Sequence, residues 1–129
     1  MFRVPEEPDE HFLMHEESVL ASLVELSGVE ILWCDDFYDG AIDGLARWDG
    51  REFWLAAVYP LDHRPRRYVL HEIRAAGVEA ASARHRQLGA YAEASRHGRL
   101  DSTQERAWGQ MWASRPDYRS APAVGWFTA

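Results

Sequence analysis

An Asp-Gly pair at residues 49–50 stands between two runs of aromatic and aliphatic residues, and it constrains the fold more than any other feature of the chain. A type I′ turn needs positive φ at both central residues, which Asp tolerates and Gly adopts freely, so the pair predicts a tight β-hairpin. A two-residue loop also fixes the register of the two strands. The predicted cross-strand pairs are Trp48 with Arg51, Arg47 with Glu52, Ala46 with Phe53, and Leu45 with Trp54.

Both faces of this hairpin mix large apolar and charged side chains. Arg51 is placed where it can lie on the ring of Trp48 as a cation–π contact. We therefore expect one face to lie on the core, and the other to be partly covered by a partner or by the C-terminal segment.

Residues 29–60 as a whole predict a three-stranded antiparallel meander that ends at Pro60. Its first turn, residues 35–40, is rich in Asp and contains Gly40, which allows left-handed backbone geometry. Residues 68–73 indicate a fourth strand, with a helix as the alternative.

Three helices are predicted around this meander. Apolar residues at helical spacing indicate a helix over residues 9–27, with Gly28 just beyond its end. A second helix is predicted over residues 78–97. A third begins at Ser102, where Ser102 and Glu105 have the spacing of a capping box.

The predicted fold class is therefore α+β: a three- to four-stranded antiparallel β-meander packed with an N-terminal helix and two C-terminal helices. We interpret residues 1–8 as a flexible arm, residues 9–119 as a single α+β domain, and residues 120–129 as an aromatic C-terminal tail.

The chain has 129 residues, enough for a domain that needs neither a disulfide nor a metal to fold. Cys34 is the only cysteine, which fits a reducing cytoplasm and is typical of a small buried hydrophobe. The N-terminal residues lack the basic and apolar regions of a signal peptide, and no run approaches the roughly 18 apolar residues of a membrane helix. We therefore expect a cytoplasmic protein with no membrane segment.

Charge is unevenly distributed along the chain. Residues 1–64 hold 4 Arg against 15 Asp and Glu, whereas residues 65–129 hold 10 Arg against 6 acidic residues, and the formal net charge is −7. The asymmetry is expected either from pairing between the two halves or from an acidic surface that meets a basic partner. The negative charge argues against nucleic-acid binding, which favours a basic surface.

One basic cluster, Arg64, Arg66 and Arg67, precedes Tyr68. Such a cluster beside an aromatic residue could hold phosphate or RNA. In an acidic chain, however, it favours a solvated loop that pairs with the acidic half.

The densest polar patch is the run from Asp35 to Asp43, with four Asp residues in nine positions. It is not an EF-hand, because ligand positions 3 and 12 of such a loop would be Phe37 and Ala46. A looser divalent-metal site and a simple turn are the alternatives, since Asp and Gly are good turn formers.

The enzymatic alternative is a small hydrolase with a pair of carboxylates, with or without a divalent metal. It would use Asp36 and Asp39 from the acidic turn, with His71 or Glu72 from a neighbouring strand. Gly-rich phosphate loops, HExxH motifs and GxSxG elbows are absent from the sequence. The sequence thus predicts no cofactor and no defined metal site, and it favours binding over catalysis.

Short motifs follow one another along the meander: WCDDFYDG at residues 33–40, then Gly44-Leu45-Ala46, Trp48-Asp49-Gly50 and Phe53-Trp54. In these motifs the chain resembles small uncharacterised bacterial proteins that carry a YDG turn before a β-hairpin. The resemblance implies no activity and no site residues.

Six Trp residues in a chain of this length favour a binding role, because Trp, Tyr and Arg dominate interface energetics. We expect an intracellular protein-binding module (an inhibitor, an immunity-type protein or an accessory subunit), monomeric or homodimeric, that binds another protein with a basic surface. The predicted binding residues are Asp35, Asp36, Tyr38, Asp39, Asp43, Trp48, Trp126 and Phe127. The alternatives are the hydrolase and a structural subunit that docks through its C-terminal tail.

Overall fold

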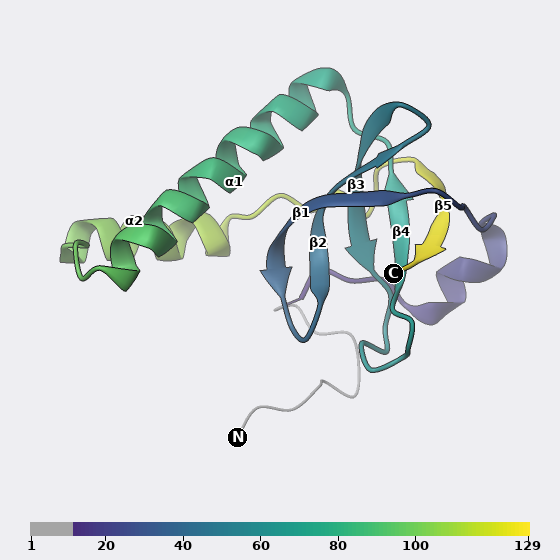
Figure 1. The fold of residues 1–129 in the computed structure, drawn as a ribbon, viewed down its shortest axis with the longest axis horizontal. Helices are drawn as coiled ribbons and strands as arrows, with labels where there is room; N and C mark the ends of the chain where they lie inside the picture. Colours follow the sequence, from purple (N-terminus) through teal and green to yellow (C-terminus); the bar gives the residue numbers. More distant parts are fainter. Residues whose placement is uncertain (1–11) are drawn as a thin grey trace. The chain divides into compact units, whose positions relative to one another are not determined.

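The computed structural model describes residues 12–129, which form two compact units (Figure 1). The first, which we call the sheet unit, contains residues 12–74 and 118–129; the second, the helical hairpin, contains residues 75–117. No helix within residues 12–129 is long and apolar enough to cross a membrane.

Five antiparallel strands in the order β1-β2-β3-β4-β5 make up the sheet unit (Figure 1). Each strand pairs with the next one along the chain, so the sheet is a meander. The strands are β1 (Glu30–Phe37), β2 (Ala41–Trp48), β3 (Arg51–Ala57), β4 (Arg67–His71) and β5 (Ala123–Thr128). The segment predicted as either a fourth strand or a helix is a strand, β4.

The β2–β3 hairpin follows the rule that its turn residues predict. All four predicted cross-strand pairs are present. Asp49 has a φ of 51° and Gly50 a φ of 73°, which are the two positive values that a two-residue turn of this type needs. Local sequence therefore specifies both the turn and the register here.

Arg51 lies over Phe53 rather than over Trp48 as predicted. Its guanidinium carbon is 5.2 Å from the centroid of the Phe53 ring. Its Nη2 is 3.2 Å from Oε1 of Glu72, the residue that follows β4. The indole of Trp48 tilts against Phe53, with ring centroids 6.0 Å apart, and donates Nε1–H to the carbonyl oxygen of Ser27 at 3.1 Å.

Both faces of the sheet carry buried side chains. One face carries the hydrophobic core, whose members include Ile42, Phe53, Leu55, Tyr68, Leu70 and Phe127. On the opposite face, Trp54 is buried and packs against Trp33 and Tyr118, with ring centroids 6.1 Å and 5.0 Å apart. Part of the predicted cover of this second face thus comes from the C-terminal segment, through Tyr118.

The predicted count of three to four strands is wrong, because the C-terminal segment forms the fifth. β5 pairs with β4, and the ring of Phe127 stacks on Tyr68 with centroids 5.2 Å apart. Without β5, the backbone groups along one edge of the buried strand β4 would have no strand partner, so pairing satisfies them while it buries the apolar side chains of the tail.

The predicted N-terminal helix over residues 9–27 is also wrong. Residues 9–11 lie outside the described residues, and the rest of the segment contains one short 3-10 helix, η1 (Glu17–Ser22). The stretches on either side of η1 bond to strands instead: His15 N–H donates to Ala57 O at 2.9 Å, and Leu26 N–H donates to Trp126 O at 2.7 Å. Sheet edges distant in sequence supply the backbone partners that a helix would supply locally, and local spacing does not reveal that competition.

The helical hairpin consists of α1 (Ala75–Arg96) and α2 (Ser102–Ala113), both within one turn of the predicted ranges. The capping box of α2 lies one residue earlier than predicted. Asp101 is the N-cap: its Oδ1 accepts from Gln104 N–H at 2.8 Å, and its own N–H donates to Gln104 Oε1 at 3.0 Å.

Candidate functional site

The most distinctive surface feature consists of the end of β1 and the turn that joins it to β2, residues 35–40, which we call the acidic tip (Figure 1). Phe37 is 66% exposed, and within residues 12–129 only Val24 matches it as an exposed large hydrophobic side chain. Asp36 precedes Phe37 directly, and Asp39 follows two residues later. An exposed aromatic side chain flanked by carboxylates is a candidate anchor for a partner, because aromatic residues are enriched among the energetic centres of interfaces.

Arg66 anchors the acidic tip from inside the protein. Its side chain is 3% exposed, and its Nη2 donates to Tyr38 O at 2.9 Å while Nη1 donates to Ala41 O at 3.1 Å. The same guanidinium donates from Nε and Nη2 to Leu61 O at 3.1 Å and 2.9 Å. Tyr68 adds a bond from its hydroxyl to Ala41 O at 2.9 Å. The backbone of the tip is therefore held in one conformation by buried donors.

A second arginine pairs with the tip at its surface. Arg64 Nη2 lies 3.1 Å from Oδ2 of Asp39, and both side chains are more than half exposed. Asp39 has a φ of 51°, a left-handed conformation that Asp tolerates. Because solvent screens an exposed ion pair, this contact contributes little to stability, and the carboxylate stays accessible.

Below the tip, a buried carboxylate organises the chain. Asp43 is 4% exposed, faces Asp36 across the β1–β2 pair, and accepts a hydrogen bond on Oδ1 from the Asp36 N–H at 3.0 Å. Asp36 in turn accepts on Oδ1 from the Phe37 N–H at 3.1 Å. Asp43 therefore supports the tip rather than forming part of its surface.

Cys34 lies beside these carboxylates and is half-buried. Burial raises the pKa of the Cys34 thiol, and the negative charges of three Asp side chains, chiefly that of Asp43, raise it further. The thiol is therefore protonated at neutral pH, which makes it a poor nucleophile.

The structure brings together only half of the predicted binding residues. Asp35, Asp36, Tyr38 and Asp39 belong to the acidic tip, although the ring of Tyr38 turns toward the core and lies 6.0 Å from that of Phe12. Phe37, the most exposed aromatic residue among those described, was not among the predicted binding residues. Its signal was present: it stands between acidic residues, at the end of a strand and before the turn.

The other predicted binding residues lie elsewhere in the sheet unit. Trp48 is half-buried at the opposite end of β2 from the acidic tip. Trp126 and Phe127 belong to β5, where Phe127 is 2% exposed and part of the core. A side chain buried to that degree stabilises the fold and presents no surface to a docking partner.

The basic cluster is not a solvated loop, contrary to the sequence-based interpretation. Arg66 and Arg67 are buried, and only Arg64 is exposed. The expected pairing with the acidic half is found for two of the three: Arg64 binds Asp39, and Arg67 Nη1 lies 2.6 Å from Oε2 of Glu17. The main role of Arg66, donation to backbone carbonyls, has no signal in the sequence, because these carbonyls come from distant segments.

His71, a candidate for the hydrolase alternative, is engaged within the sheet unit. It is 1% exposed, its Nε2 lies 2.7 Å from Nε2 of His15, and its Nδ1 lies 2.9 Å from Ala121 O. A carbonyl only accepts, so Nδ1 of His71 carries a proton, and the contact between the two Nε2 atoms needs a proton on one of them. Within residues 12–129, no three His, Cys, Asp or Glu side chains are grouped so that they could hold a metal ion.

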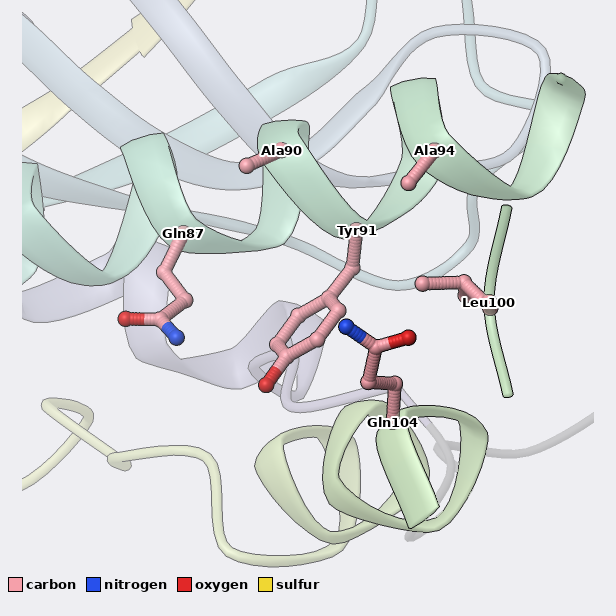
Figure 2. A pocket seen from close by; sticks show the side chains of 6 residues that line it. All are labelled: Gln87, Ala90, Tyr91, Ala94, Leu100 and Gln104. Carbon is pink, nitrogen blue, oxygen red and sulfur yellow. The ribbon is translucent and has the colours of Figure 1, made fainter. Parts of the chain in front are cut away.

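The helical hairpin carries a groove of about 300 Å³ between its two helices (Figure 2). Tyr91 extends from α1 toward α2, where Gln104 lies beside its ring, as Figure 2 shows. The residues that line the groove are Gln87, Ala90, Tyr91, Ala94, Leu100 and Gln104. Its lining is neutral, without the convergent charged groups that fix a polar ligand.

Comparison of the chain with models of protein families, with curated proteins and with solved structures finds no match. The resemblance to proteins with a YDG turn therefore stays a prediction.

Proposed function

We propose that this protein is a non-catalytic protein-binding module, of the inhibitor, immunity-type or accessory-subunit kind, and that it binds a basic partner through the acidic tip. The observation that carries the proposal is the exposure of Phe37, 66%, on a turn whose backbone is fixed by a buried arginine. Aromatic side chains that enter a pocket of the partner are the usual energetic centres of protein interfaces.

The surrounding charge supports a basic partner. Residues 30–40 contain four acidic side chains and no basic one. Complementary charge steers association and excludes wrong partners more than it raises affinity, so the carboxylates would select the partner and Phe37 would supply much of the binding energy.

The anchoring by Arg66 supports the same proposal through preorganisation. Binding orders flexible side chains and loops at a cost of affinity. A turn that two of its backbone carbonyls, those of Tyr38 and Ala41, already tie to a buried guanidinium has little conformational freedom left to lose.

The test is capture of partners from a lysate of the host with the tagged chain, at low and high salt, followed by affinity measurement with the purified partner. Phe37→Ala should weaken binding by about 30-fold, as truncation of an interface centre costs about 2 kcal/mol. Asp39→Asn should weaken it by a smaller factor that shrinks as salt rises.

Two matched variants are the controls. Val24→Ala removes the other strongly exposed apolar side chain, and Asp49→Asn removes a carboxylate at the same φ on the other turn. Both should keep wild-type affinity. If Phe37→Ala and Asp39→Asn bind as tightly as the wild type while remaining folded, the acidic tip is not the binding surface.

A further inference from the structure

The outer edge of β1 is a second feature beside the acidic tip. In the part of the chain that the structure describes, β1 is the outermost strand, paired with β2 alone. At the other end of the sheet, β5 is covered, because Trp126 exchanges backbone hydrogen bonds with Val24 and Leu26. An outermost strand presents N–H and C=O groups along its edge, and an extended segment of another chain can add there.

The shape of β1 limits which segments can add to it. The pairing of β1 with β2 shifts register at three places, at Leu32, at Asp35 and between Asp36 and Phe37, and Figure 1 shows the strand bending along its length. Bulges and charged residues are devices by which sheet edges avoid indiscriminate pairing. This edge is therefore selective, and charge is the property by which it can select.

Charge favours a basic segment over a second copy of this chain. β1 carries Glu30 at its start and Asp35 and Asp36 near its end, with no basic residue. Pairing of two β1 edges would bring carboxylates of both copies together, and like charges across a strand pair destabilise it. A basic segment would meet the same carboxylates with opposite charge.

We propose that the partner presents its charge as an extended, arginine-rich segment that adds to the outer edge of β1 as a sixth strand. This inference rests on the proposed function and specifies how the partner binds. Adjacent strands lie about 4.8 Å apart, so side chains of the added strand reach Glu30 at one end of β1 and Asp36 at the other. Phe37, at the last position of β1, packs against an apolar side chain of the same segment.

The probe is a fluorescein-labelled peptide of eight residues that alternates Arg with Val and has blocked ends. Its Kd for the full chain is measured by fluorescence anisotropy at low salt. Two further peptides have the same sequence but carry backbone N-methyl groups on all Arg or on all Val residues. Methylation removes the hydrogen-bond donors along one edge of the peptide and leaves its charge unchanged. A peptide that alternates Glu with Val is the charge control.

Strand addition predicts that at least one methylated peptide binds about tenfold more weakly or worse, because several backbone hydrogen bonds are lost. Amide hydrogen exchange in β1 should slow when the unmethylated peptide is bound, while exchange at Asp49 and Gly50 stays unchanged. The Glu peptide should not bind.

Equal binding of all three Arg peptides would overturn strand addition. If that binding is weakened by Asp39→Asn and not by Asp49→Asn, the charge-selective tip of the proposed function stands without it. Failure of the unmethylated peptide to bind would also overturn strand addition. The proposed function is then tested separately, by capture from the lysate and by the affinities of the Phe37→Ala and Val24→Ala variants.

Discussion

The two turns at the ends of β2 have nearly the same sequence and different surroundings. Each contains an aromatic residue followed by Asp and Gly, and Asp39 and Asp49 have the same φ of 51°. The β2–β3 turn stands free: a Cβ added to Gly50 would meet nothing within 4 Å. In the acidic tip, a Cβ added to Gly40 would lie 2.9 Å from Nη1 of Arg66.

The sequence of a turn therefore specifies its local geometry but not its contacts with the rest of the protein. The β2–β3 turn closes a hairpin and needs no help from the rest of the chain. The acidic tip is held by Arg66, a residue 25 or more positions away from the carbonyls of Tyr38 and Ala41 to which it donates. A turn held from inside can present an exposed aromatic side chain in a fixed position.

The largest expected effect comes from removing the anchor. Arg66→Met keeps most of the apolar stem but removes the guanidinium that donates to Tyr38 O, Ala41 O and Leu61 O, although Ala41 O keeps the Tyr68 hydroxyl as a donor and Leu61 O keeps Arg64. Because several hydrogen bonds from a buried charged donor are lost, we expect the free energy of unfolding to fall by about 3 kcal/mol. Urea denaturation measures it. Arg51→Met is the control near the other turn: its ion pair with Glu72 is exposed, and its loss should cost less than about 1 kcal/mol. Similar losses in both variants would mean that the tip is not anchored.

The two glycines give the next largest contrast. Gly50→Ala should cost about 1 kcal/mol, the strain of a left-handed alanine, whereas Gly40→Ala should cost about 2–3 kcal/mol because its φ of 138° is more strained and Arg66 must move. Thermal unfolding of both variants measures the difference. When Arg66 is replaced by Met, the difference in destabilisation between Gly40→Ala and Gly50→Ala should shrink by about 1 kcal/mol. If the difference stays the same, the strained φ of Gly40 alone explains it.

The thiol of Cys34, on β1 next to the acidic tip, provides a smaller contrast. Because burial and nearby carboxylates raise the pKa of Cys34, alkylation by iodoacetamide at pH 7 should be slower than that of a model peptide and should accelerate as pH rises. Asp35→Asn should increase the rate a few-fold, and Asp49→Asn should not. The raised pKa also makes the free energy of unfolding depend on pH. The contribution of the protonated Cys34 thiol is fully present below the unfolded-state pKa, about 8.5, and is lost as pH rises through the folded-state pKa. Equal alkylation rates in the two variants would exclude the Asp35 carboxylate as a cause of the raised pKa.

The smallest expected effect is on stability in Asp39→Asn and Asp49→Asn. Asn also tolerates a positive φ, and the Arg64–Asp39 pair is exposed, so each variant should change the free energy of unfolding by less than about 0.5 kcal/mol. Chemical denaturation checks this. If the free energy of unfolding falls by more than about 1 kcal/mol in Asp39→Asn alone, the Arg64–Asp39 ion pair stabilises the fold. Weaker partner binding by that variant would then reflect a change in the fold and not the loss of a surface carboxylate.

Within the candidate site, the acidic residues could be found from the sequence, but which of them are buried and which are exposed could not. The clustering of Asp35, Asp36 and Asp39 was visible as a pattern, and their placement on one turn follows from chain connectivity. The burial of Asp43 and the exposure of Phe37 depend on which side of β1 and β2 faces the rest of the protein, and that was not encoded within the turn itself.

The sequence alone determined the β2–β3 hairpin with its register, and the two helices of the hairpin unit. In both, the hydrogen-bond partners lie a few residues apart, so turn chemistry and side-chain spacing are sufficient. Only the tertiary structure decided that residues 24–26 lie along β5, that the C-terminal segment is a strand, and that Arg66 anchors the acidic tip. In each of these, backbone groups bond to partners tens of residues away, and the competition between such partners and a local helix or a solvated loop is settled by burial in the folded protein.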